Sequence, residues 1–326
     1  MDVIHALSSS LLNPMVLAFA LGVFATLVRS DLKIPPEIFA GLSIYLLFAI
    51  GLKGGLKLNG VTLAEVWKPI VAALALSVCI PIWCMGILRR CCRLDAVNSA
   101  AIAAHYGSVS AVTFAAAISY LDKNAVPVEG YLSALLALME VPAIIVAIFL
   151  ARRATQSGDA TNGRFKEVLH ELLTGKGIVL LLGGMTIGFL SGKSGYDQVA
   201  PFFDAPFKGV LTLFLLEIGL VTGRHLADLK AAGPRLIAFA LVMPPLHGLL
   251  GVLLAKASGM GIGGATALAT LAASASYIAA PAAVRIALPQ ASPALYFTTA
   301  LAITFPFNVV FGIPLYHHFA RSLLSP

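Results

Sequence analysis

The sequence predicts an all-α membrane protein with about ten transmembrane helices in two inverted repeats. Three observations lead to this prediction. Of the 326 residues, 59% are hydrophobic and only 11% are charged, whereas about a quarter of the residues in a soluble domain are charged. Apolar runs of about 16 to 27 residues recur along the chain, the length needed to cross a hydrocarbon core about 30 Å thick. The two halves of the chain also contain matching segments.

The apolar runs are separated by glycines, prolines and charges, and they predict ten spans. In chain order the predicted spans are 14–29, 35–53, 66–88, 96–121, 129–151, 177–192, 203–224, 234–256, 262–287 and 294–320. We expect residues 1–152 to form a first five-helix repeat, 153–176 a cytoplasmic linker, and 177–326 a second, inverted five-helix repeat. The linker segment FKEVLHELL has the pattern of a short amphipathic helix on the membrane surface.

The distribution of Lys and Arg predicts the orientation. Fourteen of the 22 basic residues lie in the linker and in the connections that follow odd-numbered spans. Because cytoplasmic loops are enriched in basic residues, we expect those connections in the cytoplasm of a bacterial inner membrane and both termini in the periplasm. The net charge of +7 forms no basic stripe with interleaved aromatic residues, so we expect no nucleic-acid partner.

The halves match at three places. IGLKGG at residues 50–55 corresponds to IGLVTG at 218–223, and AHYGSVSAVTFAAA at 104–117 corresponds to ATLAASASYIAAPA at 269–282. MEVPAIIVAIFLA in the fifth span likewise corresponds to TFPFNVVFGIPLY in the tenth. Since each half holds an odd number of spans, the second half enters the membrane with the opposite orientation.

Small polar residues and a proline interrupt two predicted spans at matching positions, in Gly107–Thr113 and Ser274–Pro281. Paired interruptions are a sequence sign of a transporter site. An interruption frees backbone N–H groups at the start of the following half-helix, where the helix dipole attracts an anion. Two such starts crossing at the midplane would bind a small anion. The alternative reading is close helix packing through small residues.

Four polar residues in predicted spans are candidates for a coupling role. Glu140 precedes Pro142 inside the fifth span, where an ionisable side chain is costly and usually functional. His105 adjoins the first interruption and could titrate near neutral pH. Asn98 and Asn308 are candidate polar ligands. For Glu140 and His105 a purely structural role remains the alternative.

Enzyme motifs are absent from the sequence. It contains no GxSxG, HExxH or Walker A pattern, so we expect neither an enzyme nor an ATP-driven pump. The four cysteines have no CxxC spacing, and no cofactor or resident metal is predicted.

The mid-span segments GSVSAVT and SASYIAAP resemble those of the sodium-dependent bicarbonate transporters, the SbtA-type permeases. IPPEIFAGLSIYLLFAIGLKGG, LPQASPALYFTTALAITFPFNVVFGIPLY and the closing GIPLYHHFARSLL also resemble this family. The resemblance implies a core domain and a gate domain, a homotrimer, bicarbonate held where two broken helices meet, sodium beside it, and a cytoplasmic PII-like partner. The substrate positions that it implies are Gly107, Ser108, Ser110, Thr113, Ser274 and Ser276.

The second segment departs from the family pattern, because Ala275 lacks a hydroxyl and Tyr277 replaces an acid. Tyr277 is therefore a further candidate at the coupling site. We expect Na⁺-coupled uptake of a small monovalent anion, bicarbonate first, by elevator-type alternating access. One alternative is a proton-coupled or uncoupled carrier of another small anion, using Glu140 or His105. An alternative of another class is a receptor or scaffold that binds anions without moving them.

Overall fold

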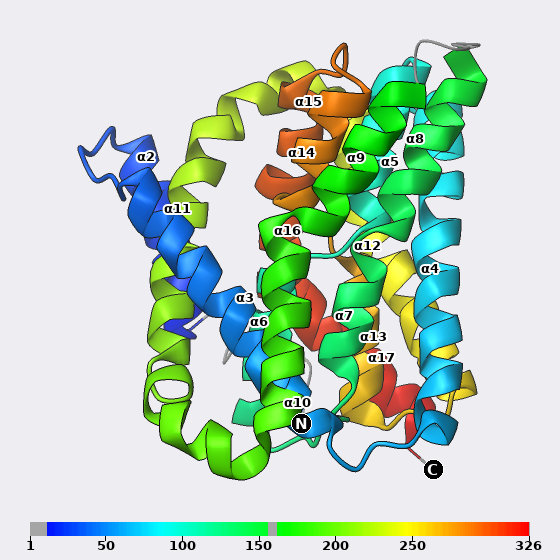
Figure 1. Ribbon diagram of the computed structural model, residues 1–326. Coiled ribbons are helices and arrows are strands. Elements are labelled where there is room, and N and C mark those ends of the chain that lie inside the picture. The colour runs from blue at the N-terminus through cyan, green and yellow to red at the C-terminus, as the bar shows by residue number, and fades with distance from the viewer. Residues whose placement is uncertain (1–11, 156–161, 326) are drawn as a thin grey trace.

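The computed structural model describes residues 12–155 and 162–325, and within these ranges the regular structure is helical throughout (Figure 1). Its elements are α2(Pro14–Leu27), α3(Pro36–Leu58), α4(Leu63–Arg90), α5(Ala96–Gly107), α6(Ala111–Lys123), α7(Leu132–Met139), α8(Pro142–Thr155), α9(Asn162–Thr174), α10(Lys176–Phe203), α11(Phe207–His225), the short 3₁₀ helix η2(Leu226–Asp228), α12(Leu229–Ala257), α13(Ile262–Ala273), α14(Ala279–Ala287), α15(Pro293–Phe297), the π-helical η3(Thr298–Thr304), α16(Phe305–Phe307), the π-helical η4(Asn308–Gly312) and α17(Ile313–Leu324).

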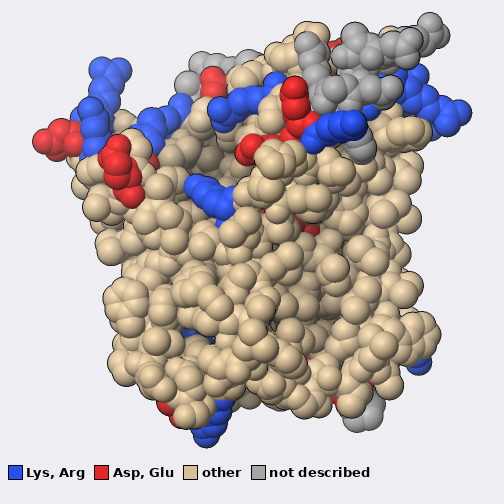
Figure 2. Space-filling view, in the orientation of Figure 1, with Lys and Arg blue, Asp and Glu red and all other residues tan. Residues whose placement is uncertain are grey.

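Several helical stretches have the length and hydropathy of membrane spans. In the described part of the chain there are seven: Pro36–Leu58, Leu63–Arg90, Ala96–Lys123, Leu132–Thr155, Lys176–Phe203, Ala232–Ala257 and Pro293–Leu324. Two shorter apolar helices are Pro14–Leu27 and Ile262–Ala273. On the face shown in Figure 2, most charged side chains lie at the upper and lower ends, with a broad belt of uncharged residues between them. The chain is therefore a multi-pass membrane protein.

The helices form two units. Helix α2 packs along α11 and α3 packs along α10, and α3 also contacts α11, so these four helices form one unit on the left and front of Figure 1. We call it the four-helix unit. The remaining helices form the larger unit, in which α5 packs against α4 and α8, and α13 packs against α12 and α17.

Glycines bring the backbones of the four-helix unit into direct contact. A Cβ on Gly55 of α3 would collide with the backbone of Met185 in α10, and one on Gly219 of α11 would collide with the backbone of Phe19 in α2. Such close approach leaves no room for side chains between the axes. It makes these four helices a closely packed body.

Glycine also ends two helical segments at places that the sequence predicted. Gly192 in α10 and Gly233 in α12 have φ values of 58° and 73°, in the left-handed region that suits glycine. The predicted span 177–192 ends at Gly192, and the predicted span 234–256 begins directly after Gly233. Both helices continue past the kink, so they are longer than predicted.

The sequence predicted interruptions in two spans only, and the structure corrects this. A third interruption separates α7 from α8 at Glu140 and Val141. Its cause is Pro142, which has no N–H to donate and which disfavours helical backbone in the residue before it. The amphipathic helix predicted in the linker is α9, and its buried Val168 and Leu172 accompany packing against α14.

Candidate functional site: the crossing of two interrupted helices

The first interruption lies between α5 and α6 and is stabilised by its own hydroxyl groups. Ser108 and Ser110 have extended backbones. The Ser110 hydroxyl oxygen accepts hydrogen bonds from the Thr113 N–H at 3.1 Å and from the Thr113 hydroxyl at 2.9 Å, as an N-cap residue does. Ser108 donates to the carbonyl of Glu140 at 2.8 Å. This bond joins the first interruption to the one between α7 and α8.

Gly107 ends α5 where three helices meet. A Cβ at this position would lie 2.6 Å from Cδ of Pro81 in α4 and 2.7 Å from Cβ of Ala143 in α8. Contacts this short require a neighbour to move. Gly107 therefore serves the close packing of α5 against α4 and α8, which was the alternative role for this segment.

The second interruption lies between α13 and α14. Ser274 has an extended backbone, and its hydroxyl donates to the Leu271 carbonyl at 2.8 Å. The Ser276 hydroxyl accepts from the Ala280 N–H at 3.3 Å in the first turn of α14. Asn308 donates its side-chain N–H to the Ala273 carbonyl at 2.8 Å. The last carbonyl of α13 thus has a donor from the tenth predicted span.

The two interruptions are bonded to each other. The Ser110 N–H donates to the Ser274 hydroxyl oxygen at 3.0 Å, and the Ser276 N–H donates to the His105 carbonyl at 2.8 Å. Each interruption therefore satisfies a backbone group of the other, as buried backbone groups require. The crossing that the sequence predicted for these two helices is present.

A small cavity of about 10 Å³ lies at the crossing. Its lining comprises Leu47, Val109, Ser110, Ala111, Glu140, Gly177, Ser276, Tyr277 and Ile278. This volume is about the least that holds one water molecule, so a larger anion requires the lining to move apart. Both units contribute to it, because Leu47 and Gly177 belong to the four-helix unit. We call it the central cavity.

The central cavity adjoins a vestibule on the side of α9. This α9-side vestibule has a volume of about 370 Å³, and Glu140, Gly177 and Ile278 line both spaces. A second vestibule of about 470 Å³, lined by Lys53, Phe114 and other residues of α3, α6, α10 and α11, shares no lining residue with the central cavity. In this conformation the crossing therefore faces the α9 side.

Glu140 occupies the boundary between the central cavity and the α9-side vestibule. Its side chain is 8% exposed, and its Oε2 atom has no hydrogen-bond partner among the described residues. A Cβ on Gly177 would lie 2.7 Å from Oε1 of Glu140, so the glycine makes room for the carboxylate. A buried oxygen without a partner is costly and is available to a cation or a proton.

The structure places the other coupling candidates differently. Tyr277 lines the central cavity, and its ring meets that of Phe305 edge-on. The His105 ring instead stacks on Tyr296, with Nδ1 2.7 Å from the Ala101 carbonyl, and His105 contributes only its backbone to the crossing.

Asn98 lies away from the crossing. It lies at the opposite end of α5 from the interruption, where its side-chain oxygen accepts from the Ser292 N–H at 2.8 Å. Asn308 lies behind the last turn of α13, where it is held by a 2.6 Å hydrogen bond from the Tyr316 hydroxyl. It supports the crossing without lining the cavity.

Sequence reasoning missed five of the lining residues: Leu47, Val109, Ala111, Gly177 and Ile278. Leu47 is one apolar residue within an apolar span, and nothing in its local pattern distinguishes it. Gly177 follows the last residue of the predicted linker, and its importance depends on Glu140, 37 positions away in the sequence. The only available signal was the position of Val109, Ala111 and Ile278 inside the two interruptions.

A multi-pass chain with paired helix interruptions around a buried cavity has the architecture of a membrane transporter. The model of the Na⁺-dependent bicarbonate transporter superfamily matches residues 14–321. The chain belongs to this superfamily, as its resemblance to the SbtA-type permeases predicted. None of the curated proteins matches it.

Proposed function

We propose that the protein is a secondary active transporter that takes up a small monovalent anion, bicarbonate first, together with Na⁺. The observation that carries the proposal is the convergence of two helix starts on one cavity. Ala111, the first residue of α6, and Ile278, the N-cap residue of α14, both line the central cavity. The first N–H groups of a helix have no acceptor within it, and the helix dipole gives that end a partial positive charge.

The residues around these helix starts suit an anion that is held without a basic side chain. Ser110 and Ser276 add hydroxyl groups to the lining, and the lining contains no Lys or Arg. An anion bound by amide and hydroxyl donors is released more easily than one paired with a buried cation, because a buried ion pair is expensive to break. This property suits a carrier that must release its cargo.

For sodium we propose Glu140 as the charged ligand. Na⁺ is a hard cation and prefers oxygen, as Ca²⁺ and Mg²⁺ do. Several carbonyls near the crossing already accept a hydrogen bond, including those of Ala273, His105 and Leu271. The Glu140 carboxylate, with Oε2 unpartnered, is the acidic group in the lining of the central cavity.

The packing of the helices supports ten spans in two inverted repeats. We assign the first repeat to α2, α3, α4, α5–α6 and α7–α8, and the second to α10, α11, α12, α13–α14 and α15–α17. Under this assignment the corresponding contacts occur in both halves: α4 with α5 and α12 with α13, α5 with α8 and α13 with α17, α4 with α8 and α12 with α17. Helix α9 and the rest of 153–176 form the linker between the repeats.

We propose elevator-type movement, with the four-helix unit as the gate and the larger unit as the core. The glycine-mediated backbone contacts support a gate that moves as one body. Few polar contacts join the units. Apart from the local His225–Asp228 contact where α11 continues into η2, the hydrogen bond between described residues that links them runs from the Thr222 hydroxyl to the Leu301 carbonyl at 3.2 Å. A contact surface with few directional bonds allows one body to slide along the other.

The family resemblance supports three further proposals. We propose a homotrimer in the bacterial inner membrane, both termini in the periplasm, and a PII-like protein that docks on the cytoplasmic face. Mass determination by light scattering in detergent tests the trimer. Protease protection of tags at either terminus in oriented vesicles tests the orientation.

The function is tested with purified protein in liposomes. We expect labelled bicarbonate to accumulate only when an inward Na⁺ gradient is imposed. Uptake that ignores sodium would reject the coupling, and absence of uptake would reject the substrate. Saturable binding of bicarbonate without flux would favour the receptor or scaffold alternative.

The buried position of Glu140 favours one second candidate, a proton-coupled carrier of a small anion. On this alternative the carboxylate carries a proton instead of binding sodium. We expect Glu140→Gln, which keeps the shape but not the charge, to abolish the dependence on the coupling ion. If uptake by the unaltered protein follows a pH gradient and Glu140→Gln removes that dependence, the proton is the coupling ion.

A further inference from the structure

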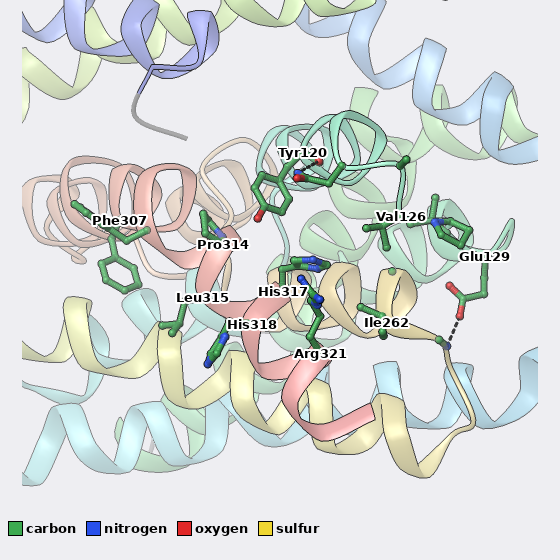
Figure 3. A pocket seen from close by; sticks show the side chains of 17 residues that line it. Tyr120, Val126, Glu129, Ile262, Phe307, Pro314, Leu315, His317, His318 and Arg321 are labelled. Carbon is green, nitrogen blue, oxygen red and sulfur yellow. Dashed lines mark hydrogen bonds between the residues drawn. The ribbon is translucent and has the colours of Figure 1, made fainter. Parts of the chain in front are cut away.

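A large pocket lies on the larger unit, away from the crossing (Figure 3). Its volume is about 1010 Å³, and it is bounded by the C-terminal end of α6, the segment 124–129, the start of α13, and the tenth predicted span from α16 to α17. It shares no lining residue with the central cavity. Val128 and Glu129 also line the second vestibule, but the remaining lining residues, including all those of α16 to α17, have no place in the proposed transport cycle.

One helical face provides a gradient of polarity along the pocket wall. Phe307, Phe311, Leu315, His318 and Arg321 line it at successive steps of three or four residues, the spacing of one side of a helix. The wall is therefore aromatic and aliphatic toward the middle of the span and basic at the chain end. Phe311 is 46% exposed, as expected for a residue that faces lipid.

The basic end has an unpaired cation. Arg321 is exposed, and its guanidinium has no hydrogen bond or ion pair among the described residues. Next to it, His317 is held by Thr266, whose hydroxyl lies 3.3 Å from Nδ1, and by the edge-on ring of Tyr120. The imidazole is thus held in place, and Figure 3 shows the exposed guanidinium beside it in the same pocket.

The acidic residue in the lining, Glu129, has one carboxylate oxygen engaged and the other, Oε2, without a hydrogen-bond partner among the described residues. Glu129 accepts a hydrogen bond from the Gly261 N–H at 2.7 Å, at the start of α13. A carboxylate at this position is favourable because it meets the positive end of the helix dipole. In Figure 3, Val126 and Ile262 lie between it and Arg321. It leaves the charge of the guanidinium available to a ligand.

We propose that this pocket binds a glycerophospholipid of the leaflet at the α17 end of the molecule. The phosphodiester would meet Arg321 and His317, and an acyl chain would lie along Phe307, Phe311 and Leu315. Arginine binds phosphate through two parallel N–H···O bonds, and the apolar part of the wall matches a hydrocarbon chain. A small hydrophilic anion would leave the aromatic wall uncovered, so an amphiphile fits the whole pocket.

A lipid bound in this pocket would contact helices that form the crossing of the two interrupted helices. Helices α6 and α13 are the outer halves of the two interrupted helices, and both border the pocket with α17. A ligand that contacts all three stabilises their arrangement, because binding to the folded state raises its stability by mass action. Occupancy should therefore raise the thermal stability of the larger unit.

The test uses the full-length protein, stripped of lipid by detergent exchange and titrated with phosphatidylglycerol. Native mass spectrometry counts bound lipid, and thermal unfolding reports stabilisation. We expect Arg321→Ala to weaken binding about 10-fold or more, since a hydrogen bond to a charged group is lost, and Arg321→Lys to restore part of it. Arg89→Ala, which removes an exposed arginine that does not line the pocket, is the matched control.

Four results would overturn the proposal. Equal binding by Arg321→Ala and Arg89→Ala would show that the guanidinium holds no phosphate. Equal stabilisation by water-soluble glycerophosphate would assign the pocket to a free phosphate, and equal binding of diacylglycerol would show that no head group is recognised. A disulfide between two copies that carry Phe311→Cys would show instead that a second chain covers the pocket.

Discussion

Replacing Thr222 by valine removes the hydrogen bond that links the two units. Thr222 is 2% exposed, and its hydroxyl donates to the Leu301 carbonyl at 3.2 Å. Leu301 lies in a π-helical stretch, in which a carbonyl accepts from the residue five positions later. That residue is Pro306, which has no N–H, and the Phe305 N–H is engaged by the Ala300 carbonyl. Thr222 therefore donates a hydrogen bond to the Leu301 carbonyl, for which the helix that contains Leu301 provides no N–H donor five positions later.

The cost of the change follows from this arrangement. Valine has nearly the shape of threonine, so packing is kept while a buried carbonyl loses its donor, which costs about 1–3 kcal/mol. If the units slide during transport, the bond exists only in the conformation described here. The substitution then shifts the equilibrium away from this conformation by about 5- to 150-fold. From an equal mixture, even a fivefold shift leaves this conformation about one sixth populated.

Thiol labelling measures the shift. In a background without the four native cysteines, a cysteine at Ala282 reports the α9-side vestibule and one at Lys57 reports the opposite vestibule. We expect Thr222→Val to slow modification of the first by a membrane-impermeant reagent and to accelerate modification of the second. Thr222→Ser, which keeps the hydroxyl, should behave as the unaltered protein does.

Thr26→Val is the matched control. The Thr26 hydroxyl also lies 3.2 Å from a carbonyl, that of Leu220, but both residues belong to the four-helix unit. Its loss should lower the stability of that unit without favouring either conformation. If Thr26→Val and Thr222→Val change the labelling rates equally, or if neither changes them, the reasoning about the two units is refuted.

Three other substitutions test separate parts of the structure. Ser110→Ala removes the cap of α6 and the acceptor for Thr113. We expect thermal unfolding to show about 0.5–2 kcal/mol lower stability and no stabilisation by bicarbonate. Stabilisation by bicarbonate equal to that of the unaltered protein would contradict the assigned role. Gly177→Val places carbon atoms against the buried carboxylate beside the central cavity, and we expect folded protein with no uptake, whereas normal uptake would exclude a role for this contact. Burial alone would raise the pKa of Asp204, but the 2.7 Å ion pair with Lys53, the hydrogen bond from Tyr196 and the charge of Lys57 together lower the pKa. A carboxylate with a lowered pKa stabilises the fold at pH values above its ordinary pKa of about 4, and this contribution is lost as the pH falls further. The stability of Asp204→Asn should therefore depend less on acid pH than that of the unaltered protein. Identical stability profiles of the two proteins between neutral and acid pH would refute this.

Much of the fold could be predicted because its cause is local. Apolar runs long enough to cross a bilayer identify a multi-pass membrane protein whatever their partners. The two interruptions were also visible, since extended serines and a proline end a helix by their own chemistry, at Ser108–Ser110 and at Ser274–Pro281. The third interruption was missed, although Pro142 is its local cause.

Within the site, the structure places two predicted residues, Ser110 and Ser276, in the lining of the central cavity, and their binding of substrate remains a prediction. Ser110 caps the helix that follows it, and Ser276 does the same in the second half. The sequence could not place a residue whose partner is distant. Asn98 has the same chemistry as Asn308, yet only Asn308 packs behind the crossing, because the bonding of an amide is decided by which helix faces it.

The amino-acid sequence by itself determined that the chain spans a membrane, where two of its helices break, and to which transporter superfamily it belongs. Only the tertiary structure decided that the breaks bond to each other through Ser110 and Ser274, that Gly177 makes room for Glu140, and that the cavity between them faces the α9 side. The reason is physical: helix breaks arise from backbone preferences within a few residues, whereas a buried cavity is formed by side chains that only packing brings together.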